Sequence, residues 1–133
     1  DLVIKKLKAK NFMLAITTTT KRTNMDIYRT LNKKYQRKAP LDEYFDLIYT
    51  REDVSKIKPD PEVYQKAMQK FNAKPEECII FEDINGIEAA KQAGIETIAI
   101  YDKYSDADTK AIKAQADFYL HNYTELLSSI DEL

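Results

Sequence analysis

Lys58 is the first of three features in this chain of 133 residues whose chemistry suits the handling of phosphate. It lies in the segment Lys58-Pro59-Asp60-Pro61, where two prolines stiffen the backbone and disfavour helix before Asp60. A rigidly placed ammonium group suits the stabilisation of a phosphoryl group during transfer. The alternative is an ordinary surface lysine in a turn.

Two adjacent carboxylates, Glu82 and Asp83, follow an apolar run that starts at Cys78. A charged side chain at the end of a buried strand costs free energy unless it is paired or binds a metal. Magnesium prefers oxygen ligands and usually takes one or two protein carboxylates together with phosphate and water. Gly86 opens the next helix, and we expect its missing side chain to leave room for a ligand. The alternative is an exposed acidic turn.

The third feature is the hydroxyl-rich segment Thr17-Thr18-Thr19-Thr20-Lys21, which follows another apolar run. Hydroxyls and backbone amides that lead into a helix N-terminus can bind a phosphate oxygen. Threonine also favours strands, so an ordinary strand end explains the segment equally well.

The three features need a scaffold that brings strand ends together. Five short apolar runs predict buried parallel strands, with both faces covered. These runs are Phe12–Thr17, Phe45–Thr50, Cys78–Glu82, Glu96–Tyr101 and Ala116–Leu120. Helical patterns lie between them, at 24–35, 61–71 and from Gly86 to Gly94. The alternation predicts an open α/β sheet, whose ligands bind at the carboxyl ends of the strands.

Composition narrows the class of protein. A net charge of −1, from 21 basic and 22 acidic residues, gives no reason to expect nucleic acid as a partner. No apolar stretch approaches the length of a membrane span, so no membrane partner is expected. One cysteine allows no internal disulfide, and we expect a cytoplasmic protein with one domain.

The motifs and their order resemble the haloacid dehalogenase-like superfamily, and within it the β-phosphoglucomutase-like subgroup, over nearly the whole chain. The resemblance implies a Rossmann-like three-layer α/β/α core with a mostly parallel sheet. It implies that Thr18 and Lys58 are catalytic and bind the transferring phosphate. Thr19, Thr20 and Lys21 would bind substrate phosphate as well. Asp83, together with Glu82, would hold Mg²⁺. Ile84 departs from the family pattern, which usually has serine there.

The family's first motif, Asp-x-Asp-Gly, which supplies the nucleophile, does not occur in this sequence. Asp106-Ala107-Asp108 has the right spacing but lies in a polar helical segment, so we reject it. We therefore expect residues 1–133 to be a partial core that carries motifs two to four. The central first strand and the helical cap would be missing, and the N-terminal segment, as a second chain or cleaved piece, would be the partner.

The function expected from this resemblance is magnesium-dependent phosphoryl transfer. The whole protein would be a phosphatase or phosphomutase for a small phosphorylated metabolite, with a sugar phosphate favoured. It would act through an aspartyl-phosphate whose Asp lies outside this chain, so this chain alone would be inactive. The alternative is a non-catalytic phosphate-binding or receiver-like module. Receivers, however, place acidic residues at the first strand and the lysine last.

Overall fold

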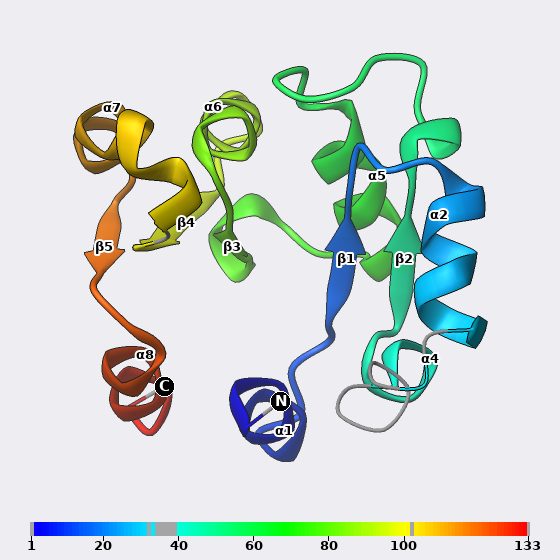
Figure 1. Ribbon diagram of the computed structural model, residues 1–133, viewed down its shortest axis with the longest axis horizontal. Helices are drawn as coiled ribbons and strands as arrows, with labels where there is room; N and C mark the ends of the chain where they lie inside the picture. The colour runs from blue at the N-terminus through cyan, green and yellow to red at the C-terminus, as the bar shows by residue number, and fades with distance from the viewer. Residues whose placement is uncertain (1, 32, 34–39, 102, 133) are drawn as a thin grey trace. The chain divides into compact units, whose positions relative to one another are not determined.

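The computed structural model describes residues 2–31, 33, 40–101 and 103–132 (Figure 1). The chain forms two compact units, Asp1–Ser55 and Lys56–Leu133. Both contain parallel strands connected through helices, which confirms the predicted α/β class. Among the described helices, none combines the length and apolarity that a bilayer crossing requires.

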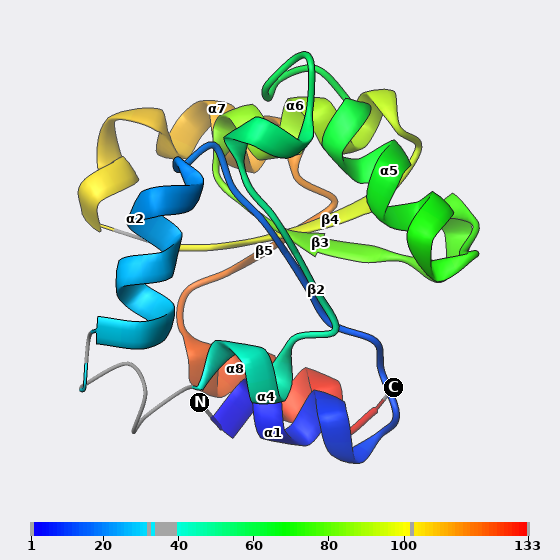
Figure 2. The same ribbon diagram turned by 90° about the vertical axis from the view of Figure 1, so that its right-hand side faces the viewer.

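The N-terminal unit is built around two parallel strands. Its elements are α1 (Leu2–Ala9), β1 (Ala15–Thr17), α2 (Arg22–Asp26), the π-helix η1 (Ile27–Leu31), α4 (Leu41–Tyr44), β2 (Leu47–Tyr49) and the 3₁₀ helix η2 (Arg51–Asp53). Strands β1 and β2 run side by side, with Ile16 opposite Ile48 (Figure 2). The helix predicted at 24–35 starts at Arg22, and its predicted end at Tyr35 lies outside the described residues.

The C-terminal unit contains a three-stranded parallel sheet in the order β3-β4-β5. Its elements are α5 (Glu62–Phe71), η3 (Pro75–Glu77), β3 (Ile79–Phe81), α6 (Ile84–Gln92), β4 (Glu96–Ile100), η4 (Lys103–Asp108), α7 (Thr109–Gln115), β5 (Phe118–Leu120) and α8 (Tyr123–Ile130). Phe81 lies opposite Ile98, which in turn lies opposite Phe118. All five predicted strands are therefore present, each shorter than the apolar run that predicted it.

Local signals explain where the helices of this unit begin and end. The Asp83 carboxylate accepts a hydrogen bond from the Gly86 amide at 3.2 Å and so caps the start of α6. Gly94, where the predicted helical pattern ends, has a φ of +76°, a left-handed conformation that glycine adopts readily after a helix. Asn72 adopts the same kind of conformation, with a φ of 52°, at the end of α5.

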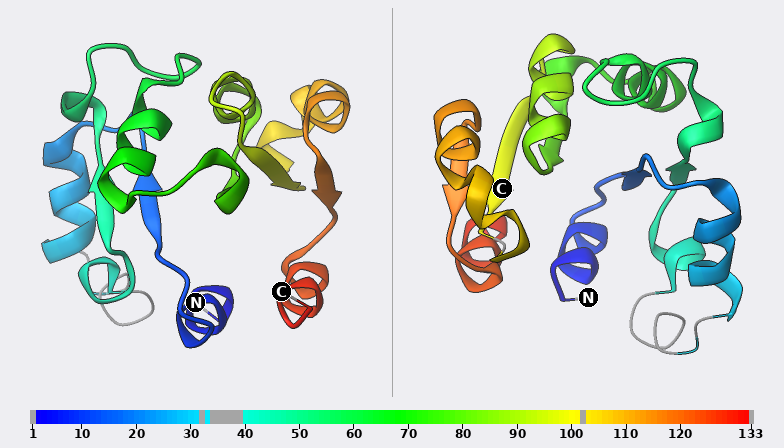
Figure 3. Two further views of the ribbon diagram at one scale, coloured as in Figure 1. Left: turned by 180° about the vertical axis from the view of Figure 1, so that it is seen from behind. Right: turned by 45° about the horizontal axis from the view of Figure 1, so that its top comes forward.

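The core of the C-terminal unit lies between one face of its sheet and two helices. Ile87 of α6, Ala99 of β4 and Ile112 of α7 are buried against one another, and Ile84 and Tyr119 pack around them. Figures 2 and 3 show α6 and α7 together on this face of the sheet, with α8 on the other side.

The other face of this sheet is less covered than predicted. Ile79 and Phe81 are 40% and 39% exposed, and Phe118 is 53% exposed. The prediction that the strands are buried on both faces is therefore wrong for β3 and β5 in this chain. In the described part of the unit, α8 is the helix on this side, and it leaves these three side chains accessible.

Candidate functional site

The predicted phosphate-binding threonines form a closed turn after β1 in the N-terminal unit. The Thr18 amide donates to the Tyr49 carbonyl at 3.0 Å and extends the ladder between β1 and β2 by one bond. The Thr18 hydroxyl accepts from the Thr20 amide at 3.1 Å and donates to the Thr20 hydroxyl at 2.9 Å. To donate to a phosphate, the Thr18 hydroxyl must therefore turn away from Thr20. Thr19 and Lys21 are exposed.

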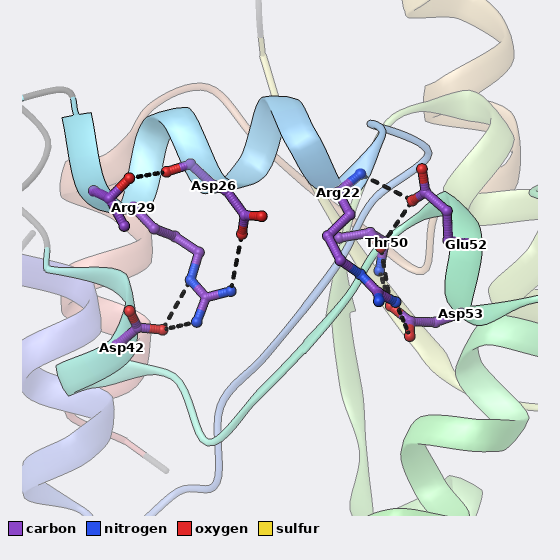
Figure 4. Close-up of polar contacts among 8 residues, drawn as sticks. Arg22, Asp26, Arg29, Asp42, Thr50, Glu52 and Asp53 are labelled. Carbon is purple, nitrogen blue, oxygen red and sulfur yellow. Dashed lines mark hydrogen bonds and ion pairs between the residues drawn. The ribbon is translucent and has the colours of Figure 1, made fainter.

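The helix N-terminus beside this turn is occupied by a carboxylate of the chain itself. Glu52 accepts a hydrogen bond from the Arg22 amide at 2.8 Å, at the first residue of α2 (Figure 4). This bond lowers the pKa of Glu52, although its carboxylate is exposed. The backbone amide that we expected to receive phosphate thus already has an anionic partner in this structure.

A buried threonine anchors the same region. Thr50 is 3% exposed and forms a capping box with Asp53, whose carboxylate accepts from the Thr50 amide at 2.7 Å. Arg22 donates to the same Asp53 side chain at 2.7 Å (Figure 4). The Arg51 amide then donates to the Thr20 carbonyl at 3.1 Å, which fixes the end of the threonine turn.

Lys58 begins a loop that side chains and backbone hold in place, as the two prolines predicted. The Glu62 carboxylate accepts from the Lys56 amide at 2.7 Å. Gln92, from α6, donates to the Pro59 carbonyl at 3.3 Å. Asp60 accepts from the Glu62 amide at 3.0 Å, as a helix cap would, although α5 itself begins at Glu62.

Lys58 and Glu82, which are 24 residues apart in the sequence, form an ion pair within the C-terminal unit. The Lys58 side chain is only 7% exposed, and the Glu82 side chain is 19% exposed. Burial of two charges is costly unless each has a close partner of opposite sign. The pair therefore depends on the carboxyl end of β3 and on the Lys58 loop staying together.

Tyr64 contacts both members of this pair. Its hydroxyl donates to Glu82 Oε1 at 3.0 Å, and Lys58 Nζ lies 5.3 Å from the centre of its ring. Tyr64 lies within the helical pattern predicted at 61–71, and the structure buries it, at 3% exposure. The spacing of residues gave no signal for its polar contacts, because these arise from tertiary packing.

Asp83 is the better of the two candidate magnesium ligands. It is exposed, whereas Glu82 already bonds to Lys58 and Tyr64 through one oxygen. The second oxygen of Glu82 accepts from the Asp83 amide at 3.3 Å. Within the described residues, no group of three or more His, Cys, Asp or Glu side chains is arranged to hold a metal. Two adjacent carboxylates nevertheless fit Mg²⁺, which completes its coordination with phosphate and water.

Gly86 leaves room for a neighbouring side chain. A β-carbon at this position would lie 2.5 Å from Cβ, Cγ and Cδ of Glu82. The absent side chain therefore makes room for the side chain of Glu82, because the helix passes close to this carboxylate. Ile84, where the resemblance led us to expect serine, packs against the apolar core of the unit.

Comparisons with known proteins confirm the family that the sequence resembles. The haloacid dehalogenase-like hydrolase family matches residues 1–100 of the chain. Pyrophosphatase PpaX of Bacillus thuringiensis is 33% identical over 132 residues, which are 98% of this chain and 57% of PpaX. A phosphorylated carbohydrates phosphatase of Thermotoga maritima is 38% identical over 94 residues, which are 69% of this chain and 40% of that protein.

The solved structures show the same relationship. A Thermotoga maritima protein described as a beta-phosphoglucomutase superposes with a TM-score of 0.79 at 28% identity. The superposition covers 99% of this chain and 58% of that protein. The chain therefore spans somewhat more than half the length of these proteins, apart from the shorter match to the carbohydrate phosphatase.

Proposed function

Because the chain belongs to the haloacid dehalogenase-like hydrolase family, we propose that it is the part of a phosphatase or phosphomutase that binds phosphate and magnesium. The observation that carries the proposal is the nearly buried Lys58 ammonium paired with Glu82, which directly precedes the exposed Asp83. A cation held at the carboxyl end of a parallel strand, next to magnesium ligands, is the arrangement that phosphoryl transfer requires. The proposal includes the cytoplasmic location that the composition predicts.

In the proposed reaction, an aspartate outside this chain attacks phosphorus and forms an aspartyl-phosphate. Lys58 binds an equatorial oxygen of the phosphoryl group, and Thr18 donates to another after its hydroxyl turns from Thr20. Thr19, Thr20 and Lys21 contribute contacts to substrate phosphate. Asp83, with Glu82, holds Mg²⁺, which neutralises charge on the phosphate when it is bound.

The proposed partner is the N-terminal segment with the Asp-x-Asp-Gly motif and the cap. In the described strands, β1 pairs only with β2, and β3 pairs only with β4. Each of β1 and β3 thus has one edge without a strand, and such edges readily accept another. We expect the 133-residue chain by itself to bind Mg²⁺ weakly and to release no phosphate from any substrate.

The substrate class that we favour is a sugar phosphate. Two of the three relatives described above are named for phosphorylated carbohydrates or phosphoglucose, whereas the third is named a pyrophosphatase. The longer protein that carries this chain should be assayed with hexose phosphates and with pyrophosphate at equal concentrations. Faster release of phosphate from pyrophosphate would contradict the sugar phosphate assignment but not the reaction type.

The reaction type is tested by Lys58→Ala in the same longer protein. Loss of a group that stabilises transferring charge typically lowers kcat by about 100-fold or more. Lys113→Ala is the matched control, because Lys113 also lies over a tyrosine ring, with its Nζ 4.9 Å from the Tyr119 centroid. Equal activity of the two variants would contradict the proposed role of Lys58.

The metal site is tested by two substitutions of Asp83. Asp83→Asn keeps an oxygen that can accept from the Gly86 amide but removes the negative charge, whereas Asp83→Ala removes both. In calorimetric titration with Mg²⁺, both variants should lose the binding of the unmodified chain. In thermal unfolding, only Asp83→Ala should lose the contribution of the helix cap. Unchanged magnesium affinity in Asp83→Asn would contradict the assignment of this ligand.

A further inference from the structure

The buried tyrosine of α5 joins the two charges of the candidate site. Tyr64 donates its hydroxyl proton to Glu82 Oε1, the same oxygen that bonds to Lys58 Nζ, and its ring faces the Lys58 ammonium. A single side chain thus offers a donor to the anion and an electron-rich face to the cation.

The placement of Tyr64 is rigid. Its neighbours on the buried face of α5, Val63 and Ala67, are 3% and 8% exposed, and Tyr64 itself is 3% exposed. Its amide donates to the Pro61 carbonyl at 3.1 Å, directly after the loop that carries Lys58. The same helix start therefore sets the position of the Lys58 loop and of the Tyr64 ring.

A purely apolar role does not account for these contacts. A phenylalanine would fill the same space in the core, but it would leave the Glu82 oxygen with one donor fewer in a poorly hydrated site. Hydrogen bonds to charged groups contribute more than bonds between neutral groups, because the charge strengthens the attraction. The Tyr64 hydroxyl thus bonds to the carboxylate that holds Lys58.

We propose that Tyr64 is a positioning residue: it holds the Glu82 carboxylate against Lys58 and thereby fixes the ammonium group that acts on the phosphate. This inference rests on the proposed function. It adds a residue that the motifs do not contain, and it predicts that the effect of Tyr64 on the reaction passes entirely through the Lys58–Glu82 pair.

The first test measures kinetics of the longer protein that carries this chain, with Tyr64→Phe as the variant. Removing the hydroxyl should lower kcat about tenfold, the usual effect of losing one hydrogen bond to a charged group, with KM changed less than about twofold. Tyr101→Phe is the matched control, since the Tyr101 hydroxyl donates to a different carboxylate, Asp106, at 3.4 Å.

The outcomes separate this inference from the proposed function. If Lys58→Ala lowers kcat about 100-fold while Tyr64→Phe behaves like Tyr101→Phe, the inference is overturned and the proposed function stands. If Lys58→Ala leaves activity unchanged, the proposed function is contradicted, and the inference that rests on it is overturned as well. In a Lys58→Ala background, Tyr64→Phe should cause no further loss, and an additional tenfold loss would show that Tyr64 acts by another route.

The second test uses nuclear magnetic resonance on the 133-residue chain and needs no activity. In the unmodified chain we expect a resolved signal for the Tyr64 hydroxyl proton and a slowly exchanging Lys58 ammonium signal. Tyr64→Phe should broaden the Lys58 signal, while Tyr101→Phe leaves it unchanged. A Tyr64 hydroxyl that exchanges as fast as that of an exposed tyrosine would overturn the inference even if the variant failed to fold.

Discussion

Thr97 and Asp117 exchange three hydrogen bonds across 20 residues of sequence. The amide and hydroxyl of Thr97 donate to Asp117 Oδ2 at 2.8 and 3.1 Å, and the Asp117 amide donates back to the Thr97 hydroxyl at 3.1 Å. Thr97 is completely buried on β4, and Asp117 immediately precedes β5. The pair therefore joins the start of one strand to the start of the next.

Asp117→Ala should destabilise the chain, because it leaves two buried donors of Thr97 without an acceptor. We expect a loss of about 2 kcal/mol in the free energy of unfolding, measured with urea at pH 7. Asp108→Ala is the matched control, since Asp108 precedes α7 without a capping bond from its side chain. A loss no greater than that of the control would show that the pair does not stabilise the fold.

The contribution of Asp117 should also depend on pH. The hydrogen bond from the Thr97 amide is the main cause that lowers the Asp117 pKa in the folded chain. Its stabilising effect is therefore complete above the unfolded value of about 3.9 and is lost as the pH falls through the lower folded value. The stability difference between the unmodified chain and Asp117→Ala should shrink below about pH 4. A stability difference that grows as the pH falls would contradict this predicted direction.

Gly86→Ala should disturb the candidate site more than the fold around it. The new β-carbon would lie 2.5 Å from Glu82 Cβ, an atom that cannot rotate away, so either the side chain or the helix start must move. We expect the Lys58 ammonium signal to broaden and activity of the longer protein to fall. The control is Gly94→Ala, whose β-carbon would make an ordinary contact 3.7 Å from Pro75 Cβ but would strain a backbone with a φ of +76°.

The two glycine variants should therefore change different measurements: Gly86→Ala the candidate site, and Gly94→Ala the stability of the fold. Gly94→Ala should cost about 1 kcal/mol of stability and leave the Lys58 signal as it is. If Gly86→Ala left both the Lys58 signal and activity unchanged, the proposed close contact between α6 and Glu82 would be wrong.

Thr50→Ala should weaken the segment that follows β2. The Thr50 hydroxyl accepts from the Asp53 amide in the capping box and also donates to Asp53 Oδ2 at 3.0 Å, so we expect a loss of about 1 kcal/mol. Thr50→Ser retains the hydroxyl and should recover most of this loss. Thermal unfolding of the three proteins measures the effect, and equal losses in both variants would assign it to the methyl group instead.

Asp46 should contribute more to the free energy of unfolding than its ion-pair partner Lys8. Asp46 accepts from the Leu14 amide at 2.8 Å and from Lys8 Nζ at 2.9 Å, and the Leu14 bond is the larger cause of its lowered pKa. Lys8→Met should cost less than about 1 kcal/mol, because both side chains are about a third exposed. Asp46→Ala should cost more in urea unfolding, and a larger loss from Lys8→Met would contradict this order.

The sequence by itself determined the class of fold and the family motifs. Continuous apolar runs predicted all five strands, because the strands of a parallel sheet are typically short continuous apolar runs. The two prolines after Lys58 predicted a stiff loop there, because proline restricts the backbone angles locally. Gly94 predicted the end of α6, because glycine permits a positive φ. Such signals are readable because they act within a few residues.

Only the tertiary structure decided which partners the site residues take. Lys58 and Glu82 are 24 residues apart, and their contact depends on how α5 and β3 pack. The same packing makes Tyr64 a partner of both charges, and it brings α6 so close to Glu82 that position 86 has no room for a β-carbon. Long-range contacts like these leave no periodic trace in the sequence, because they depend on distances between elements and not on spacing within one.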